Sequence, residues 1–132
     1  MSERSERITS ALKDLGSIPP LPIWPGVVAR VVQGARITLS VVELPPGGVV
    51  PEHRHENEQI GICVTGSLTF RVGDEKRDIG PGGTWRILAD VPHEVETGPD
   101  GAVVIEVFSP VRDDWNAIEP APEASPRWPA EA

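Results

Sequence analysis

Glycine and proline interrupt this sequence so often that long helices have little room to form. Of its 132 residues, 13 are Gly and 15 are Pro, and the segments between them are short and apolar or alternating. Such segments predict β-strands joined by turns, in a sandwich or a barrel. The expected strands cover residues 27–32, 36–44, 49–55, 59–65, 67–72, 84–88 and 102–108. The chain is therefore predicted to be mostly β, with a barrel domain over residues 21–112.

Residues 1–20 precede the strands and differ from them in pattern. Three apolar residues lie at helical spacing before Gly16 and a pair of prolines, which predicts a short N-terminal helix and a proline-rich linker. These three residues are Ile8, Leu12 and Leu15.

Residues 113–132 are rich in Pro, Ala and Glu, which predicts an extended, solvated tail remote from any ligand. Trp115 and Trp128 could anchor this tail to the barrel or to a second subunit. The tail has five acidic residues and one basic residue, so it holds half of the net charge of −8. The overall acidity therefore does not argue against an acidic ligand.

The charge balance and the apolar runs exclude several classes of function. The chain has only 12 basic residues and 20 acidic ones, which argues against nucleic-acid binding. The longest apolar run is residues 102–105, whereas a membrane span needs about 20 residues. The charged N-terminus does not resemble a signal peptide, and a lone Cys63 cannot form an internal disulfide. We expect a cytoplasmic protein.

The three histidines are the first chemical signal. His53 and His55 lie two residues apart on an expected strand, so their side chains leave the same face and can converge on one ion. His93 is the third histidine. Taken alone, a His-x-His pair is more often part of a solvated loop than a metal site.

The spacing of the glycines around this pair makes a metal site the better interpretation. Gly47, His53, His55, Gln59 and Gly66 are separated by five, one, three and six residues. This series resembles the first motif of the cupin family, with Gln59 in place of the more usual Glu.

A second cupin motif is matched less closely. His93 follows Gly82 at the expected separation, but Leu88, Asp90 and Thr97 stand where Pro, Gly and Asn are usual. The resemblance covers residues 40–112 and implies a double-stranded β-helix, or jelly-roll barrel. It also implies a divalent metal ion in the barrel mouth, bound by His53, His55, Gln59 and His93.

The fourth ligand has a competitor in Glu58, which carries a charge but should face the other side of the strand from Gln59. Three neutral imidazoles and a neutral amide would leave the charge of the ion uncompensated and strengthen its Lewis acidity. Zn, Ni, Fe, Co and Mn are all compatible with this ligand set.

Glu106 is the only charged residue in the apolar run 102–108. It lies either on an exposed edge strand or near the barrel mouth, where it could act as a general acid or base. Arg112 could return to the same mouth and bind a carboxylate, or it could be a surface residue paired with Asp113 or Asp114.

The segment 106–115 narrows the resemblance within the family. With the run His-x-His-x-x-x-Gln-Ile-Gly, it resembles pectin-degradation cupins of the KdgF type, which open the ring of unsaturated uronates. Those proteins carry a carboxylate, usually Asp, then a Phe and an Arg beside the metal, matched here by Glu106, Phe108 and Arg112. The resemblance implies a metal-dependent enzyme that opens a 4,5-unsaturated uronate, in which Arg112 and Phe108 bind the substrate and Glu106 moves a proton.

Two other classes of function remain open. One is a non-catalytic cupin that binds or senses a small ligand, and the other is a metal-dependent dioxygenase or cyclase with an apolar pocket.

Small cupins commonly pair through sheet faces, so a homodimer is expected. Three further residues are interpreted as structural: Trp85 as core or subunit contact, Arg71 as solvent-exposed and Cys63 as a buried apolar residue.

Overall fold

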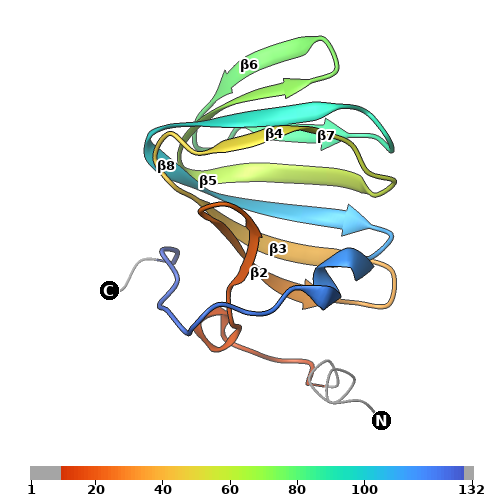
Figure 1. Ribbon diagram of the computed structural model, residues 1–132, viewed down its shortest axis with the longest axis vertical. Coiled ribbons are helices and arrows are strands. Elements are labelled where there is room, and N and C mark those ends of the chain that lie inside the picture. Colours follow the sequence, from red (N-terminus) through yellow and green to blue (C-terminus); the bar gives the residue numbers. More distant parts are fainter. Residues whose placement is uncertain (1–9, 130–132) are drawn as a thin grey trace.

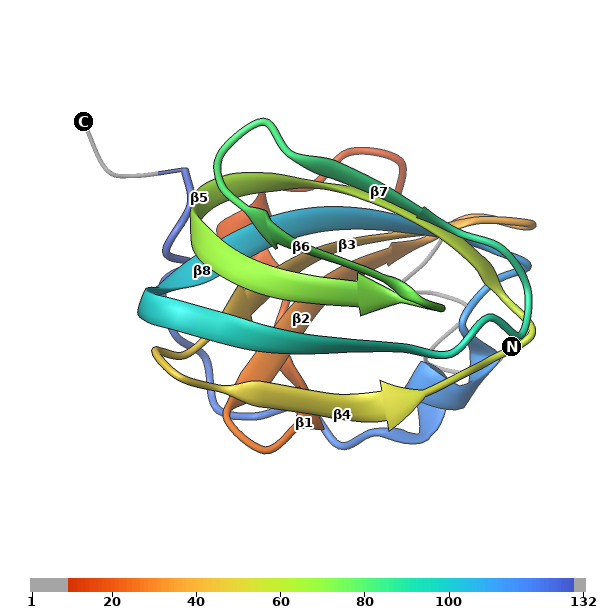
Figure 2. The ribbon, with the colours of Figure 1, turned by 90° about the horizontal axis from the view of Figure 1, so that it is seen from above.

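The computed structural model describes residues 10–129, and it confirms a mostly β jelly-roll barrel (Figures 1 and 2). One antiparallel sheet has the order β1-β2-β3-β8-β5-β6, with β4 beside β8 and β7 beside β5. Its strands are β1 (Leu21–Trp24), β2 (Val27–Gln33), β3 (Thr38–Leu44), β4 (Val49–His53), β5 (Glu58–Val72), β6 (Glu75–Ile79), β7 (Thr84–Ile87) and β8 (His93–Ser109).

The long strands β5 and β8 belong to both halves of the rolled sheet. The first part of β5 pairs with β7 and the end of β8, and its second part pairs with β6 and the start of β8. Register shifts between Cys63 and Thr65 and between Gly66 and Leu68 mark where β5 passes from one half to the other. Gly66 has a φ of +79°, and a Cβ there would lie 1.9 Å from the carbonyl oxygen of Gly101. Only glycine fits this corner.

The sequence predicted most of the strands, but it placed a strand end where β8 continues and it missed two strands. The predicted turn at residues 98–101 does not end a strand, because β8 continues through it while pairing with its neighbours on both sides. Strands β1 and β6 were not predicted. β6 is almost entirely polar and exposed, so its backbone pairing with β5 forms it without an apolar signal.

The predicted N-terminal helix is wrong over the described residues. Only a 3-10 turn, η1 (Leu15–Ser17), forms there, and Ile8 lies outside the described residues. Leu12 is 90% exposed, so no apolar face is buried that could stabilise so short a helix.

The segment after the barrel is extended, as predicted, but it lies against the barrel. It begins with the short helix η2 (Asp113–Ala117) and then returns along β2 and β3 (Figure 1). The buried side chain of Arg30 donates to the carbonyl oxygen of Ala124 at 2.6 Å, and the backbone N–H of Arg127 donates to Glu43 at 3.0 Å. These bonds fasten the segment to the sheet.

Apolar side chains from both halves of the sheet fill the barrel interior. They include Val42, Val50, Leu68, Phe70, Ile87, Val95 and Val104. Polar side chains gather at one end of this interior, where the candidate site lies. Among residues 10–129, no helix is both long and apolar enough to cross a membrane.

Candidate metal centre

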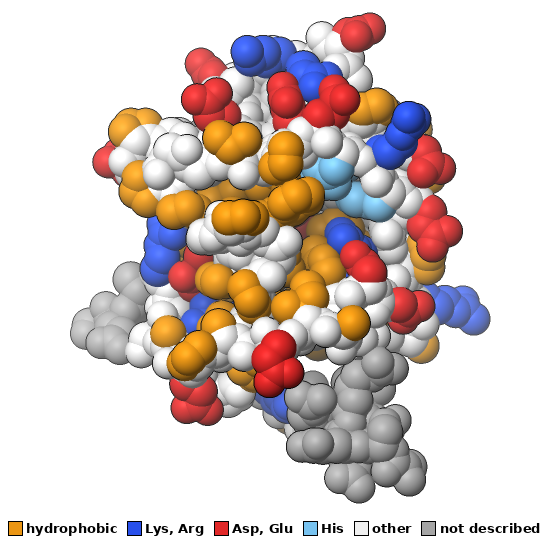
Figure 3. All heavy atoms as spheres, in the orientation of Figure 1, with side chains coloured by type: hydrophobic (Ala, Val, Ile, Leu, Met, Phe, Trp, Pro, Cys, Tyr) orange, Lys and Arg blue, Asp and Glu red, His pale blue; other side chains and the backbone are white. Residues whose placement is uncertain are grey.

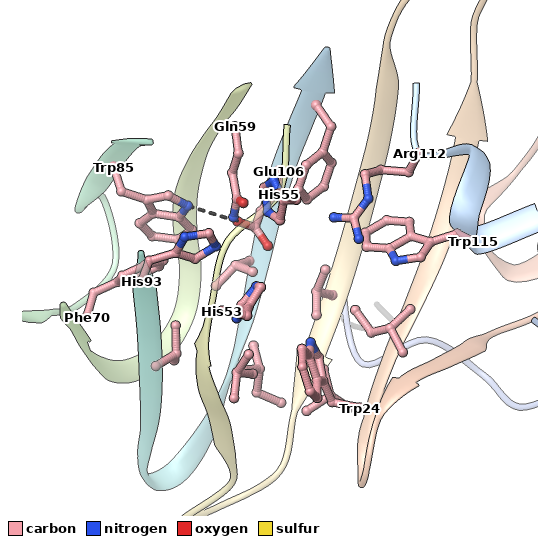
Figure 4. A pocket seen from close by; sticks show the side chains of 18 of the residues that line it. Trp24, His53, His55, Gln59, Phe70, Trp85, His93, Glu106, Arg112 and Trp115 are labelled. Carbon is pink, nitrogen blue, oxygen red and sulfur yellow. Dashed lines mark hydrogen bonds between the residues drawn. The ribbon is translucent and has the colours of Figure 1, made fainter. Parts of the chain in front are cut away.

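Three histidines converge at one end of the barrel (Figure 4). His53 ends β4 and pairs across the sheet with His93 at the start of β8, so their rings lie 4.2 Å apart. His55 lies just beyond the end of β4, with its ring 5.0 Å from that of His93. One nitrogen from each of the three rings lies within 4.8 Å of the others, and these atoms could hold a metal ion.

The hydrogen bonds of the rings leave the correct nitrogen free for a metal. In each histidine, Nδ1 lies 2.8 to 2.9 Å from a backbone carbonyl oxygen two residues away. A carbonyl only accepts, so Nδ1 carries the proton and Nε2 keeps a lone pair. Nε2 of His55 and Nε2 of His93 are buried without a hydrogen-bond partner among the described residues. A backbone carbonyl that accepts from the other ring nitrogen is typical of metal-binding histidines.

Burial keeps two of the rings neutral. It lowers the pKa of His93 to about 4 and also lowers the pKa of His55, and the positive charge of Arg112 acts in the same direction on both. A neutral imidazole can bind a metal ion and a protonated one cannot. His55 and His93 are therefore in the form that binds a cation at neutral pH.

Gln59, and not Glu58, lines the cavity beside the histidines. Glu58 is exposed, whereas Gln59 is buried and lies next to the ring of His55. The amide nitrogen of Gln59 donates to Oε2 of Glu106, so the amide oxygen is not engaged by this carboxylate. Oε1 of Gln59 is buried and has no partner within residues 10–129. This oxygen suits the fourth ligand position.

Glu106 lies on the interior face of β8, between β3 and β5, so it is not on an exposed edge strand. Its Oε2 accepts hydrogen bonds from Trp85 Nε1, at 2.9 Å, and from the amide of Gln59. No hydrogen bond of the described residues involves Oε1. Burial raises the pKa of Glu106, and the two hydrogen bonds and Arg112 offset part of this increase. Glu106 thus presents one unbound oxygen to the cavity.

Arg112 faces the same cavity from the opposite wall (Figure 4). Its guanidinium lies 4.8 Å from the ring centre of Phe108 and 4.1 Å from that of Trp115. Its Nε and Nη2 donate to the carboxylate of Asp114 at 3.0 and 2.9 Å. The pairing with Asp114 that the sequence allowed is present, but Arg112 is not a surface residue, because its side chain is 11% exposed and lines the cavity.

These groups surround a cavity of about 230 Å³. Figure 3 shows histidine side chains beside a hollow on this face of the molecule. Trp24 of β1 lies 5.2 Å from the ring of His53, and Trp115 and Ile118 line the cavity from beyond the barrel. The expectation that the tail is remote from any ligand is therefore wrong for these residues, because η2 folds over the barrel mouth.

A family model for the cupin domain matches residues 40–108, which is more than half of the chain. The chain belongs to the cupin family.

Two of the proteins that this cupin resembles are KdgF proteins. It is 29% identical over 80 residues to the pectin degradation protein KdgF of Dickeya dadantii, a match that spans 60% of this chain and 73% of the relative. The structure of KdgF from Halomonas sp. is 26% identical with a TM-score of 0.73, covering 80% of this chain and 97% of that one. An RmlC-like cupin from Shewanella frigidimarina shares the fold, at 19% identity and a TM-score of 0.75, over 80% and 96% of the two chains.

Asn57 is a site residue of this cupin that sequence reasoning missed. Its buried side chain donates to the carbonyl oxygens of Pro110 and Val111, at 2.6 and 3.2 Å. Its own carbonyl oxygen accepts from His55 Nδ1. Asn57 therefore joins the histidine loop to the segment that carries Arg112. In the sequence it signals only a turn.

Trp85 is a core residue, as predicted, and also a partner of Glu106. It is 8% exposed and packs 4.9 Å from the ring of Phe70. Cys63 is buried, as predicted. Arg71 lies outside the cavity and bonds to Glu52 and Glu94, but its side chain is half-buried and not fully exposed as predicted.

Replacement of Gly61 by alanine should damage the cavity through Trp85. A Cβ at this position would lie 2.5 Å from Trp85 Nε1, so the indole must move away from Glu106. We expect Gly61→Ala to lower the free energy of unfolding by about 1–3 kcal/mol, as measured by urea denaturation. Gly80→Ala is the control, because a Cβ there contacts nothing within 4 Å. Equal stability of the two variants would contradict the prediction.

Proposed function

We propose that this cupin is a metal-dependent enzyme that opens the ring of a 4,5-unsaturated uronate. The observation that carries the proposal is the arrangement of Glu106 and Arg112. An unbound carboxylate oxygen and a cationic guanidinium face the same small cavity as three metal-competent histidines. The similarity to two KdgF proteins, one named for pectin degradation, supports a sugar acid as the substrate.

The residues present fit a divalent cation. His53, His55 and His93 would hold it through Nε2, with Gln59 Oε1 as the fourth ligand, and Zn, Ni, Fe, Co and Mn all suit this set. When bound, such an ion supplies Lewis acidity toward an oxygen of the sugar.

Arg112 would bind the carboxylate of the substrate. Guanidinium and carboxylate groups form paired hydrogen bonds of matching geometry. The rings of Phe108 and Trp115 cover the faces of the guanidinium and exclude water from them, which strengthens its attraction for an anion.

Glu106 would move the proton that ring opening requires. The bond between the ring oxygen and the anomeric carbon breaks, and the anomeric hydroxyl loses its proton and becomes an aldehyde. The enolate left across C4, C5 and the former ring oxygen then gains that proton at C4 and becomes a ketone, so no atom is gained or lost overall. Oε1 of Glu106 is free to take up and deliver this proton, because both hydrogen bonds of the carboxylate go to Oε2.

The test is an assay of the metal-loaded protein with an unsaturated galacturonate monosaccharide. We expect loss of the absorbance of the conjugated enol ether, at a rate well above that in buffer with the same metal. Product analysis should show an open-chain keto-aldehyde of unchanged mass. No acceleration over buffer with any of the five metals would contradict the proposal.

A second candidate follows from the deeper lining of the cavity. Several apolar side chains line it below the histidines: Val27, Val42, Leu44, Val50, Leu68, Val95 and Val104. An apolar pocket suits a dioxygenase or a cyclase that acts on an aromatic or polyketide-like molecule. A reaction that stops under anaerobic conditions would favour the dioxygenase over the uronate enzyme.

A further inference from the structure

The ion pair of Arg112 and Asp114 has a geometry that a simple surface pair does not need. Asp114 contacts Nε and Nη2, which form one edge of the planar guanidinium. A guanidinium has five N–H groups, and this contact uses two of them. Among residues 10–129, Nη1 forms no hydrogen bond. The edge formed by Nη1 and Nη2 is therefore still available for a second carboxylate.

The surroundings show which way the free edge faces. The side chain of Arg112 is 11% exposed and that of Asp114 is 63% exposed, so Asp114 lies on the solvent side of the pair. In Figure 4 the end of the guanidinium points across the cavity toward Glu106 and His55. Asp114, at the rim of the cavity, thus holds the Nε–Nη2 edge of the guanidinium, while the adjacent Nη1–Nη2 end points into the cavity.

Phe108 and Trp115 restrict the guanidinium in a complementary way. Their rings lie within 5 Å of it, and they fix the plane of the group without fixing its rotation within that plane. A bidentate bond to Asp114 fixes that rotation. The pKa of Asp114 is lowered by its hydrogen bonds with Arg112, so the carboxylate stays ionised at neutral pH.

We propose that Asp114 is a positioning residue that aims the free edge of Arg112 at the carboxylate of the ligand. The inference rests on the proposed function, because it takes the ligand to be a small sugar acid. Asp114 and the ligand would bind different edges of one guanidinium, so they would not compete for the same N–H groups. Without Asp114, Arg112 would have to be ordered when the ligand binds, and the ligand would bind more weakly.

The experiment measures binding without turnover. Metal-loaded full-length protein is titrated in a calorimeter with galacturonate, which is saturated and cannot open by the proposed route, and with its methyl ester, which lacks the charge. Wild type is compared with Asp114→Ala, with the isosteric Asp114→Asn and with Asp113→Ala. Asp113 is an exposed neighbour whose side chain forms no hydrogen bond or ion pair with the described residues, so it is the matched control.

We expect Asp114→Ala to weaken galacturonate binding about tenfold, the loss of roughly one charge-assisted hydrogen bond. Binding of the ester should not change, and Asp114→Asn should be intermediate because its amide oxygen can accept one of the two bonds. Asp113→Ala should match the wild type with both ligands. Metal content should be equal in all four proteins.

Three outcomes would overturn the role of Asp114. Tighter binding of galacturonate by Asp114→Ala would show that Asp114 competes with the ligand. An equal loss for acid and ester would show a merely structural role. Failure of wild type to bind the acid better than the ester would show that Arg112 holds no sugar carboxylate.

The two proposals can fail separately. If the acid-specific loss is observed but the unsaturated uronate is not converted, the ring-opening reaction is wrong and the role of Asp114 stands. If the wild type converts the uronate and Asp114→Ala has the same KM, the role of Asp114 is wrong and the reaction stands. A raised KM with a smaller change in kcat supports both.

Discussion

Replacement of His53 by alanine is expected to abolish stoichiometric metal binding and, with it, conversion of the uronate. His53 supplies one of three converging nitrogens and comes from a different strand than His93, so no other side chain of the cluster can take its place. Loss of a ligand should weaken metal affinity by on the order of 100-fold or more, beyond what loss of a residue that only hydrogen-bonds to a ligand does. Metal content after dialysis, measured by mass spectrometry, checks this directly.

Arg54→Ala is the matched control for His53→Ala, because Arg54 is the exposed residue between His53 and His55. The control should bind metal as the wild type does. The thermal midpoint of unfolding adds a second measurement: metal should raise it in wild type and control but not in His53→Ala. Full metal occupancy in His53→Ala would exclude the histidine cluster as the metal site.

Replacement of Glu106 by glutamine should remove turnover while leaving the metal site intact. An amide of the same size can still accept the N–H of Trp85, but it cannot take up and deliver a proton. Loss of general acid–base catalysis costs about 10²- to 10⁴-fold in rate, and we expect kcat to fall by this amount. Steady-state kinetics with the unsaturated uronate, alongside metal analysis, provide the measurement.

Glu58→Gln is the control for Glu106→Gln. It removes a carboxylate from the exposed face of the same sheet, next to Gln59, and should leave kcat unchanged. If Glu106→Gln keeps the rate of wild type, another group moves the proton. If it loses metal as well as rate, Glu106 acts by holding Gln59 and not by proton transfer.

The sequence was sufficient to predict the barrel and the convergence of the histidines. The histidines do converge, but not through the predicted repeat of one strand, because β4 ends at His53 and His55 lies in the segment beyond it. The glycine spacing around the histidines locates the corners of the sheet, and Gly66 shows why, because its positive φ and its contact with Gly101 admit no side chain. Features that depend on local backbone geometry are therefore readable from the sequence.

The hydrogen bonds that Trp85 and Asn57 form in the site depend on which residues of distant segments pair with each other. This pairing cannot be predicted from the sequence pattern. Trp85 reaches Glu106 because β5 pairs with both β7 and β8, bringing the two strands to either side of Gly61. Asn57 likewise bonds to a segment more than 50 residues away. The identity of the metal and the expected homodimer stay predictions.

The C-terminal segment, which is bonded to β2 and β3, supplies one wall of the cavity and can therefore influence which ligand fits there. The cupin match ends at residue 108, before Arg112, Asp114, Trp115 and Ile118, all of which line the cavity. The candidate metal ligands lie inside the match and this wall lies outside it. Exchange of the flanking segment between relatives would therefore be a route to new ligand preferences that leaves the metal chemistry in place.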